Sequence, residues 1–370
     1  MSNTKYYYEL DILRGIACLL VFFCHLSINQ IFKPLVFFSG ANGVCLFFVI
    51  SGFIISKLFG DTLIKSDISS LKNWYKAIYI NKAEIYKFWW RRFYRLFPAF
   101  CLMVCCAFIA TIEFALTYGG ITDAIFAFIK FANNLLFLEV NDKNLTNISN
   151  YPIPEKLVLG VTWSINCEIL FYFIFPFIVI FRNFKEMLPV IVAALILFKF
   201  ILTCFIPYPI LHGHLFMHFD DFGVGILIGY YHKSINFNRK LLKIFLIVAL
   251  INLIISSPDI TYRSYIHALI SSALLVYIAS MQQGMLNVPL LGTFLNFIGR
   301  RSYFIYMMHN IIDYFMWVPF KRLVNSFPAY TGGVFSDQNP EIINHYRHLV
   351  VFLIVIVLSE IFYRFVERRN

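Results

Sequence analysis

The sequence predicts an all-α membrane protein with about ten transmembrane helices. Of its 370 residues, 60% are hydrophobic and 14% are charged, and the mean hydropathy is +0.72. Soluble domains are about 45–50% apolar and about 25% charged. Many apolar runs here approach about 20 residues, the length that an α-helix needs to cross a hydrocarbon core about 30 Å thick. This composition excludes a soluble globular domain as the main body of the chain.

Ten apolar segments are long enough to serve as spans. In chain order they are 10–28, 35–58, 97–118, 163–181, 188–206, 214–231, 241–256, 264–281, 294–318 and 348–365. We expect a Lys-rich loop at 59–90 and a second loop at 319–346, which contains a Gly-Gly turn and Pro340. Residues 1–9 are polar and no small-residue cleavage site follows the first apolar run, so we expect no cleaved signal peptide.

The segment 121–140 is apolar but contains Lys130, Asn133 and Asn134, and we expect it to be re-entrant or interfacial rather than spanning. With the N-terminus in the cytoplasm, this assignment puts most of the 31 Lys and Arg on the cytoplasmic side, as the positive-inside rule requires. If the segment 121–140 were counted as an eleventh span, the basic ends of the later helices would lie on the outer side of the membrane. The predicted topology therefore has ten spans, both termini in the cytoplasm, and a single membrane domain over 1–370.

Composition also limits the chemistry. All eight Cys lie in apolar stretches and resemble small buried hydrophobes. The net charge of +11 fits topology bias and binding of anionic ligands at the cytoplasmic face, and we expect no nucleic-acid partner. The chain has no phosphate-binding glycine loop, no GxSxG elbow and no HExxH or paired CxxC motif. Ionisable residues inside the helices remain as the candidate machinery.

The first span carries an Arg and a His on nearly one face. Arg14 and His25 are eleven residues apart, which is about three turns and about 16 Å along a helix. A neutral His can take a proton from a hydroxyl group near pH 7, and a permanently charged Arg can hold a phosphate or thioester group. The alternative is that Arg14 snorkels to the interface and His25 is a packing residue.

Three arginines lie within one turn before the third span. Arg91, Arg92 and Arg95 follow the Lys-rich loop at its expected cytoplasmic end, and Arg92 and Arg95 share a face. They would form an anion site for a polyphosphate-bearing cofactor, or act simply as positive-inside anchors.

The fourth span is expected to open from the outside at Trp163. Ser164, Glu168 and Tyr172 are spaced by four and share a face of this helix. A carboxylate about 8 Å inside the helix is costly unless it is paired, so we expect Glu168 to be functional, for example by orienting His25. Trp163 is either an interfacial belt residue or part of an acceptor site.

Two later spans also begin with polar residues. The sixth carries Asp220 and Asp221 near His214 and His218, which we expect to be a polar acceptor-binding rim rather than a metal site. Its Gly225 and Gly229 form a small-xxx-small pair typical of helix packing.

The ninth span has a polar face that should point into the bundle. The residues on this face are Ser302, Tyr306 and His309, and Tyr303 lies beside them. His309 would be a substrate ligand or a hydrogen-bonded packing residue.

Taken together, these stretches resemble the membrane-bound acyltransferase 3 family of bacterial polysaccharide and lipopolysaccharide O-acetyltransferases. The residues that carry the resemblance, in family order, are Arg14-x10-His25, Gly43 to Phe53, Arg91-Arg-x-x-Arg-Leu-x-Pro98, Trp163-Ser-x-x-x-Glu168 with Phe171-Tyr172, Asp220/Asp221 to Gly229, Gly299-x-x-Ser-Tyr-x-x-Tyr-x-x-His309 and Glu367. The resemblance implies a ten-span bundle that moves an acetyl group from acetyl-CoA to a sugar hydroxyl at the outer face. It makes His25 and Arg14 the essential pair, turns the arginines near 91–95 toward CoA, and lines the active region with Trp163 to Glu168.

We therefore expect a bacterial inner-membrane O-acyltransferase. Acyl-CoA is its co-substrate, a cell-surface or lipid-linked glycan is its acceptor, and membrane lipids surround it. No permanently bound cofactor or metal is expected, and neither is the appended periplasmic hydrolase-like domain of some family members. His25 would act as a general base or as a covalent acyl carrier, with Glu168 as its catalytic partner. The alternative function is a transporter or flippase for a lipid-linked glycan or for acyl groups, without covalent catalysis. A third alternative is a non-catalytic membrane receptor, which would tolerate His25→Ala.

Overall fold

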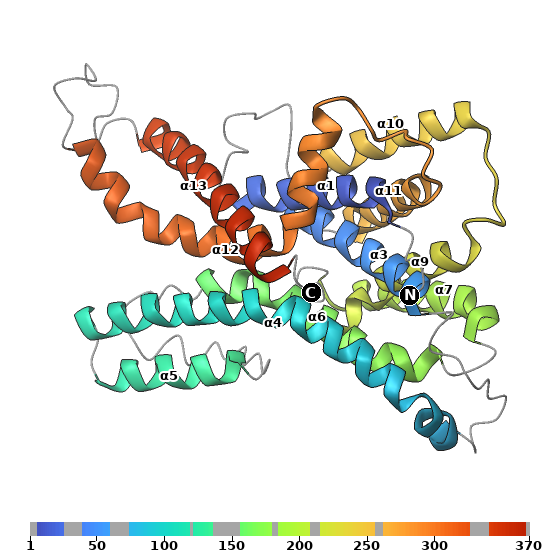
Figure 1. Cartoon of the computed structure of the whole chain (residues 1–370), viewed down its shortest axis with the longest axis horizontal. Coiled ribbons are helices and arrows are strands. Elements are labelled where there is room, and N and C mark those ends of the chain that lie inside the picture. Colours follow the sequence, from blue (N-terminus) through green and yellow to red (C-terminus); the bar gives the residue numbers. More distant parts are fainter. Residues whose placement is uncertain are drawn as a thin grey trace. The chain divides into compact units, whose positions relative to one another are not determined.

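The computed structural model describes residues 6–25, 39–59, 74–118, 121–135, 156–179, 184–207, 215–255, 262–325 and 340–367. Throughout these ranges the regular secondary structure is helical (Figure 1). The helices are α1 (Tyr8–His25), α3 (Gly40–Phe59), α4 (Trp74–Tyr118), α5 (Ile121–Leu135), α6 (Lys156–Val179), α7 (Phe184–Thr203), the 3₁₀ turn η2 (Leu215–His218), α9 (Phe219–Tyr231), α10 (Arg239–Ile255), α11 (Tyr262–Ser280), α12 (Leu291–Asn325), α13 (Pro340–Phe362) and the π turn η3 (Tyr363–Glu367).

Four helices in the described ranges are long and apolar enough to cross a bilayer. The candidate spans are Gly40–Lys57, Ile78–Ala110, Glu186–Thr203 and Tyr346–Val366. The prediction of an all-α, multi-pass membrane protein is therefore confirmed, whereas the number of ten spans stays a prediction. Helix α5 has 15 residues, about 22 Å, which is shorter than a hydrocarbon core and agrees with a segment that does not span.

The expected loop at 59–90 is wrong from Trp74 onward, because α4 begins there and continues without a break to Tyr118. The first part of this helix is polar overall, but one of its faces is buried. Asn81, Ile85, Phe88 and Arg92 are buried and follow one another at three- and four-residue intervals, while the residues between them are largely exposed. That periodicity stabilises a helix in spite of the many lysines.

Three helix ends also differ from the prediction. Helix α6 starts at Lys156, so Trp163 lies about two turns inside the helix rather than at its outer end. Helices α12 and α13 both extend into the expected loop at 319–346. Pro340, expected in that loop, is the first residue of α13, where a fixed φ and a missing N–H are favourable.

The chain forms two compact units, each built from separate parts of the sequence. Unit 1 comprises Met1–Phe93 and Cys167–Ser302, and unit 2 comprises Tyr94–Asn166 and Tyr303–Asn370. In unit 1, α3 packs against α1, α9 and α11, α10 packs against α11, and α7 packs against α9. Leu13, Leu46 and Leu275 are central members of the apolar core that these helices share.

Glycines allow α3 and α9 to approach closely. A Cβ added to Gly225 would overlap backbone atoms of Val49, and one added to Gly229 would overlap the Ser56 hydroxyl. On the other helix, a Cβ on Gly52 would overlap the backbone of Phe222. The prediction that Gly225 and Gly229 serve helix packing is confirmed.

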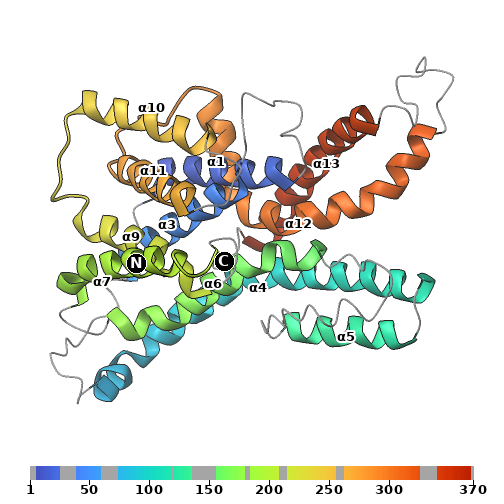
Figure 2. The same cartoon turned by 180° about the vertical axis from the view of Figure 1, so that it is seen from behind.

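Unit 2 contains two helix pairs. Helix α5 runs beside the C-terminal half of α4 in both views, and the ring centroid of Phe108 lies 4.6 Å from that of Phe131 (Figure 2). Helices α12 and α13 are joined by an ion pair in which Arg347 Nη1 lies 3.0 Å from Asp313 Oδ1. Phe304 and Phe362 pack at 4.7 Å between the same two helices.

Candidate functional site

His25 is the last residue of α1, and its side chain is exposed. Its Nδ1 lies 2.9 Å from the carbonyl oxygen of Val21. A carbonyl oxygen only accepts, so Nδ1 carries the hydrogen and the lone pair of the neutral ring lies on Nε2. The local helix therefore fixes the tautomer that a general base or nucleophile at Nε2 requires.

Arg14 lies beside the middle of α3 and is paired on its own helix. Helices α1 and α3 run antiparallel, with Gly40 beside His25, Gly43 beside Val21, and the Tyr7 ring 5.3 Å from the Phe53 ring. Arg14 is halfway between Tyr7 and Val21 in sequence, so it lies level with the middle of α3. Its Nη1 lies 3.3 Å from Asp11 Oδ1, which gives the guanidinium an acidic partner within one turn of α1.

Glu168 on α6 is held by two hydroxyl groups. Ser51 Oγ on α3 donates to Glu168 Oε1 at 3.1 Å, and the Tyr172 hydroxyl, one turn further along α6, donates to the same oxygen. The predicted neighbours on one face, Glu168 and Tyr172, are thus in contact. In the part of the chain that the structure describes, Glu168 binds Ser51 and Tyr172 rather than His25.

The three arginines of α4 have different environments. The Arg92 guanidinium is buried, with its Cζ 5.2 Å from the ring centroid of Tyr172 and 5.8 Å from that of Phe88. Arg91 is exposed, whereas Arg95 is half-buried and belongs to unit 2. Trp89 Nε1 donates to the Tyr172 carbonyl at 3.1 Å. Within unit 1, then, Arg91 can reach a soluble anion, whereas Arg92 supports the Glu168–Tyr172 pair.

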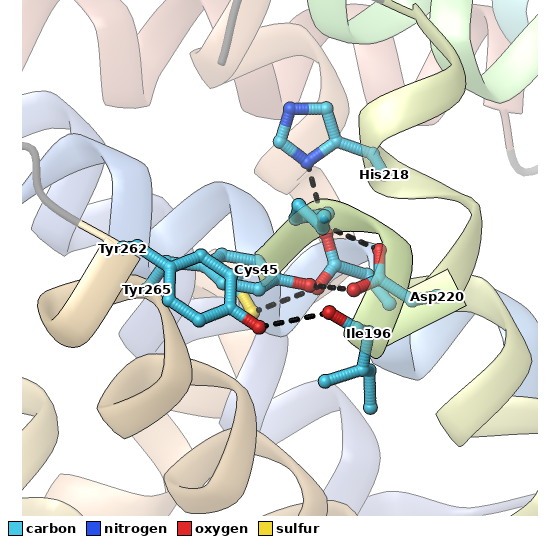
Figure 3. A network of polar contacts seen from close by, with 8 residues as sticks. Cys45, Ile196, His218, Asp220, Tyr262 and Tyr265 are labelled. Atoms are coloured by element: carbon cyan, nitrogen blue, oxygen red, sulfur yellow. Dashed lines mark hydrogen bonds and ion pairs between the residues drawn. The ribbon is translucent and has the colours of Figure 1, made fainter. Parts of the chain in front are cut away.

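A second polar cluster lies inside unit 1, around the start of α9 (Figure 3). Asp220 is 1% exposed, and its Oδ1 lies 2.7 Å from Lys199 Nζ on α7. The hydroxyl of Tyr265 on α11 donates to the other oxygen of Asp220. Lys199 Nζ also lies 3.8 Å from the Tyr265 ring centroid. The Lys199 ammonium thus compensates the charge of this buried carboxylate, and the Tyr265 hydroxyl satisfies its second oxygen.

Asp221 is fully buried, with His218 Nδ1 2.9 Å from its Oδ2 and Cys45 Sγ 3.4 Å from its Oδ1. The Tyr265 hydroxyl, whose single hydrogen is shared with Asp220, lies 3.1 Å from Asp221 Oδ1. The sequence placed Asp220 and Asp221 on an acceptor-binding rim. The structure instead buries both and gives them protein partners, because α3, α7 and α11 all pack around the start of α9. His214 lies outside the described residues.

The remaining predicted residues, except Ser302, lie in unit 2. Ser164 Oγ and Tyr306 OH are 2.7 Å apart and buried, and Tyr303 OH donates to the Leu96 carbonyl at 2.8 Å. His309 is fully buried, as predicted, with its Nδ1 2.8 Å from the Tyr306 carbonyl. Trp163 is half-buried. These bonds fit helix packing as well as they fit a substrate site.

Ser302 ends unit 1. It is buried on α12, and its carbonyl oxygen lies 3.7 Å from Cys18 Sγ on α1. Glycines bring these helices together, since a Cβ added to Gly15 would overlap Leu295 and one added to Gly299 would overlap Asp11.

Four residues of these clusters were not among the predicted site residues: Ser51, Lys199, Tyr265 and Cys45. Lys199 carried a usable signal, because it is a single charge inside the apolar run 188–206 and such a charge needs a buried partner. Ser51, Tyr265 and Cys45 carried none, since small polar and aromatic residues are common in membrane helices.

Comparison with known protein families shows that residues 7–364 match a family described as an acyltransferase domain. "O-acetyltransferase OatA" of Staphylococcus aureus (strain NCTC 8325 / PS 47) is 27% identical over 183 residues, which cover 49% of this chain and 26% of the relative. "Peptidoglycan O-acetyltransferase OatA" of Listeria monocytogenes is 27% identical over 197 residues, covering 51% of this chain and 28% of the relative. The chain thus matches about a quarter of the length of these relatives. No solved structure matches.

Proposed function

Because the chain belongs to the acyltransferase family that matches residues 7–364, we propose that it is a multi-pass membrane O-acyltransferase. It takes an acyl group, acetyl in the simplest case, from cytoplasmic acyl-CoA and places it on a hydroxyl group of a cell-surface or lipid-linked glycan at the outer face of the bacterial plasma membrane. The names of the two relatives support O-acetyl transfer, and that of the Listeria protein supports a glycan acceptor.

The observation that carries the proposal is the tautomer of His25. Its Nδ1–H donates to the Val21 carbonyl, so Nε2 has the lone pair. On the direct route, Nε2 takes the proton of the acceptor hydroxyl while the hydroxyl oxygen attacks the acyl carbonyl. On the covalent route, Nε2 attacks the thioester itself and the acyl-imidazole then passes its acyl group to the hydroxyl. Both routes require the same nitrogen.

The arginines serve the donor in this scheme. Exposed Arg91 binds CoA phosphates, while buried Arg92 fixes Tyr172 and through it Glu168. Arg95 adds positive charge one turn along α4. Arg14, at mid-depth beside α3, attracts the polarised thioester oxygen. Glu168 remains the proposed catalytic partner of His25. The predicted acceptor residues of unit 2, Ser164 and Tyr306 among them, remain candidate ligands of the sugar.

The test compares membranes that carry wild-type protein, His25→Ala or His267→Ala at equal expression. His267 is an exposed histidine on α11 and is the matched control. With acetyl-CoA labelled in the acetyl group, we expect labelled ester on glycan in the wild type and in His267→Ala, and its loss in His25→Ala. Equal ester in all three would contradict the role of His25. Movement of glycan across the membrane without ester would favour the flippase alternative.

A further inference from the structure

The first part of α4 carries a stripe of exposed aromatic rings. Its members are Tyr75, Tyr79, Tyr86, Trp90 and Phe93. At about 100° per residue these five positions fall within about 60° of arc, on the side of the helix opposite its buried face. The last three rings stack in series, with centroids 5.9 Å apart between Tyr86 and Trp90 and 5.6 Å apart between Trp90 and Phe93. The rings therefore form one continuous outer surface, which we call the aromatic stripe.

Basic side chains accompany the aromatic stripe. Lys76, Lys82 and Lys87 are exposed, and Lys82 Nζ lies 4.2 Å from the ring centroid of Tyr79. Glu84 is the one acid in the sequence from 75 to 93; it is half-buried, and its Oε1 lies 3.1 Å from Lys87 Nζ. The outer face of this segment thus combines Tyr and Trp rings with a surplus of positive charge.

The outer face of another helix of unit 1 has a different composition. On α10, the large exposed side chains between residues 244 and 255 are all aliphatic: Ile244, Ile247, Val248, Ile251 and Ile255. Aliphatic side chains suit the hydrocarbon core of a membrane, whereas Tyr, Trp, Lys and Arg gather at its interface with water. The composition of the outer face of residues 75–93 is therefore that of a surface in contact with lipid headgroups.

The length of α4 supports the same placement. Its candidate span, Ile78–Ala110, has 33 residues and is about 50 Å long, whereas the hydrocarbon core is about 30 Å thick. A straight helix of that length would fit into the core only at a tilt of about 50° or more, beyond the range of about 0–40° for membrane helices. The span expected at 97–118 is long enough to cross the core by itself. Residues 75–93 then lie outside the hydrocarbon core.

We propose that residues 75–93 of α4 form an interfacial helix that binds the headgroups of anionic phospholipids. The lysines bind the lipid phosphates, and the aromatic stripe lies at the boundary between the headgroups and the acyl chains. The stripe is about 27 Å long, which fits a lipid surface better than one small anionic ligand. The proposal does not depend on acyl transfer, so it stands or falls separately from the proposed function.

Trp90 reports the position of this face. The full-length protein is reconstituted in vesicles of equal parts phosphatidylcholine and phosphatidylglycerol. One of the two lipids at a time carries bromine on its acyl chains, either near the ester group (shallow) or near the chain end (deep). Bromine quenches tryptophan fluorescence on contact. The signal of Trp90 is the difference between the wild type and Trp90→Phe, a variant that keeps an aromatic ring in the stripe.

Two charge variants test the role of the lysines. The first combines Lys76→Gln, Lys82→Gln and Lys87→Gln and removes the exposed lysines beside the aromatic stripe. The matched control removes the same charge from exposed positions after α9 and on α10, and combines Lys233→Gln, Lys240→Gln and Lys243→Gln. Because all six side chains are exposed, both variants should remain folded.

We expect shallow bromine to quench Trp90 more strongly than deep bromine. Brominated phosphatidylglycerol should quench it at least about twofold more strongly than brominated phosphatidylcholine. The variant that lacks Lys76, Lys82 and Lys87 should keep the preference for shallow bromine and lose the preference for phosphatidylglycerol. The control variant should behave like the wild type.

Three results in the wild type would overturn the proposal: equal quenching by the two lipids, stronger quenching by deep bromine, or no quenching by either lipid. A loss of the phosphatidylglycerol preference in both charge variants would also overturn it, because the preference would then reflect net charge rather than the lysines of α4. If free CoA abolished the shallow quenching, the face would belong to the acyl donor instead of the lipid.

Discussion

Ser51 on α3 donates its hydroxyl hydrogen to Glu168 on α6 over 3.1 Å, joining two helices more than a hundred residues apart in sequence. The bond helps to orient a carboxylate inside unit 1. Tyr172 fixes the same oxygen from the next turn of α6. Among the described residues, these two hydroxyl groups hold Glu168 in one position.

Ser51→Ala tests that arrangement. Loss of one hydrogen bond to a charged group is worth about 1.5–3 kcal/mol, so we expect ester formation to fall about tenfold or more. The matched control is Ser280→Ala, since the hydroxyl of this buried serine donates to the Tyr277 carbonyl of its own helix. Steady-state rates of acetyl transfer in membranes provide the measurement. Equal rates for the two variants would remove Glu168 from the active region.

Arg91 and Arg92 should affect different kinetic constants. Arg91 is exposed, so Arg91→Gln should raise the KM for acyl-CoA several-fold, more at low salt than at high salt, and leave kcat nearly unchanged. Arg92 lies against the Tyr172 ring, so Arg92→Lys loses a planar contact and should lower kcat. Arg239→Gln, at an exposed site on α10, is the control. If Arg92→Lys changed the KM for acyl-CoA and Arg91→Gln did not, the roles assigned to the two arginines would be reversed.

The close approach of α3 and α9 predicts a large effect of a single methyl group. Gly225→Ala would press its Cβ against backbone atoms of Val49 and Phe53, which cannot rotate away. We expect a destabilisation of about 1–3 kcal/mol, measured as a lower melting temperature in detergent. Gly284→Ala is the control, because a Cβ there meets no atom within 4 Å and the cost is that of its positive φ, about 1 kcal/mol. A stable Gly225→Ala protein would contradict the packing of these helices.

The ion pair between Asp313 and Arg347 predicts coupling within unit 2. Arg347→Met leaves the half-buried Asp313 carboxylate without its cation and should cost about 1–3 kcal/mol of stability. Adding Asp313→Asn should restore part of that loss, because the amide carries no charge. A double-mutant cycle on thermal unfolding measures the coupling. Additive effects of the two substitutions would show that the pair contributes nothing to holding α12 against α13.

The helical membrane fold followed from hydropathy, because runs such as 40–57 leave few alternatives to a spanning helix. The Lys-rich start of α4 could not be recognised in the same way. Its composition is that of a loop, and only the burial of Asn81, Ile85 and Phe88 against the rest of unit 1 makes it a stable helix. When most residues of an amphipathic helix lie on its polar face, the average composition of the segment does not reveal the apolar face.

Contacts within one helix were easier to predict than contacts between helices. Glu168 and Tyr172 touch because a spacing of four brings them together on any helix. The partners of Asp220 and Asp221 come from α3, α7 and α11, and no local pattern in the sequence indicates which distant lysine, tyrosine or cysteine meets them. His218 was predicted to belong to a polar acceptor-binding rim, whereas its ring nitrogen lies 2.9 Å from Asp221, a carboxylate three residues away that the helical spacing could have indicated.

In the proposed reaction, one acyl group leaves CoA for every ester formed on the glycan. Purified protein in liposomes, with acetyl-CoA on one side and the glycan acceptor on the other, allows free CoA thiol and acetyl ester to be counted separately. We predict one thiol per ester, released on the side to which acetyl-CoA was added, and neither product from His25→Ala. Glycan that crosses the membrane with no ester and no thiol would contradict an acyltransferase and identify a flippase.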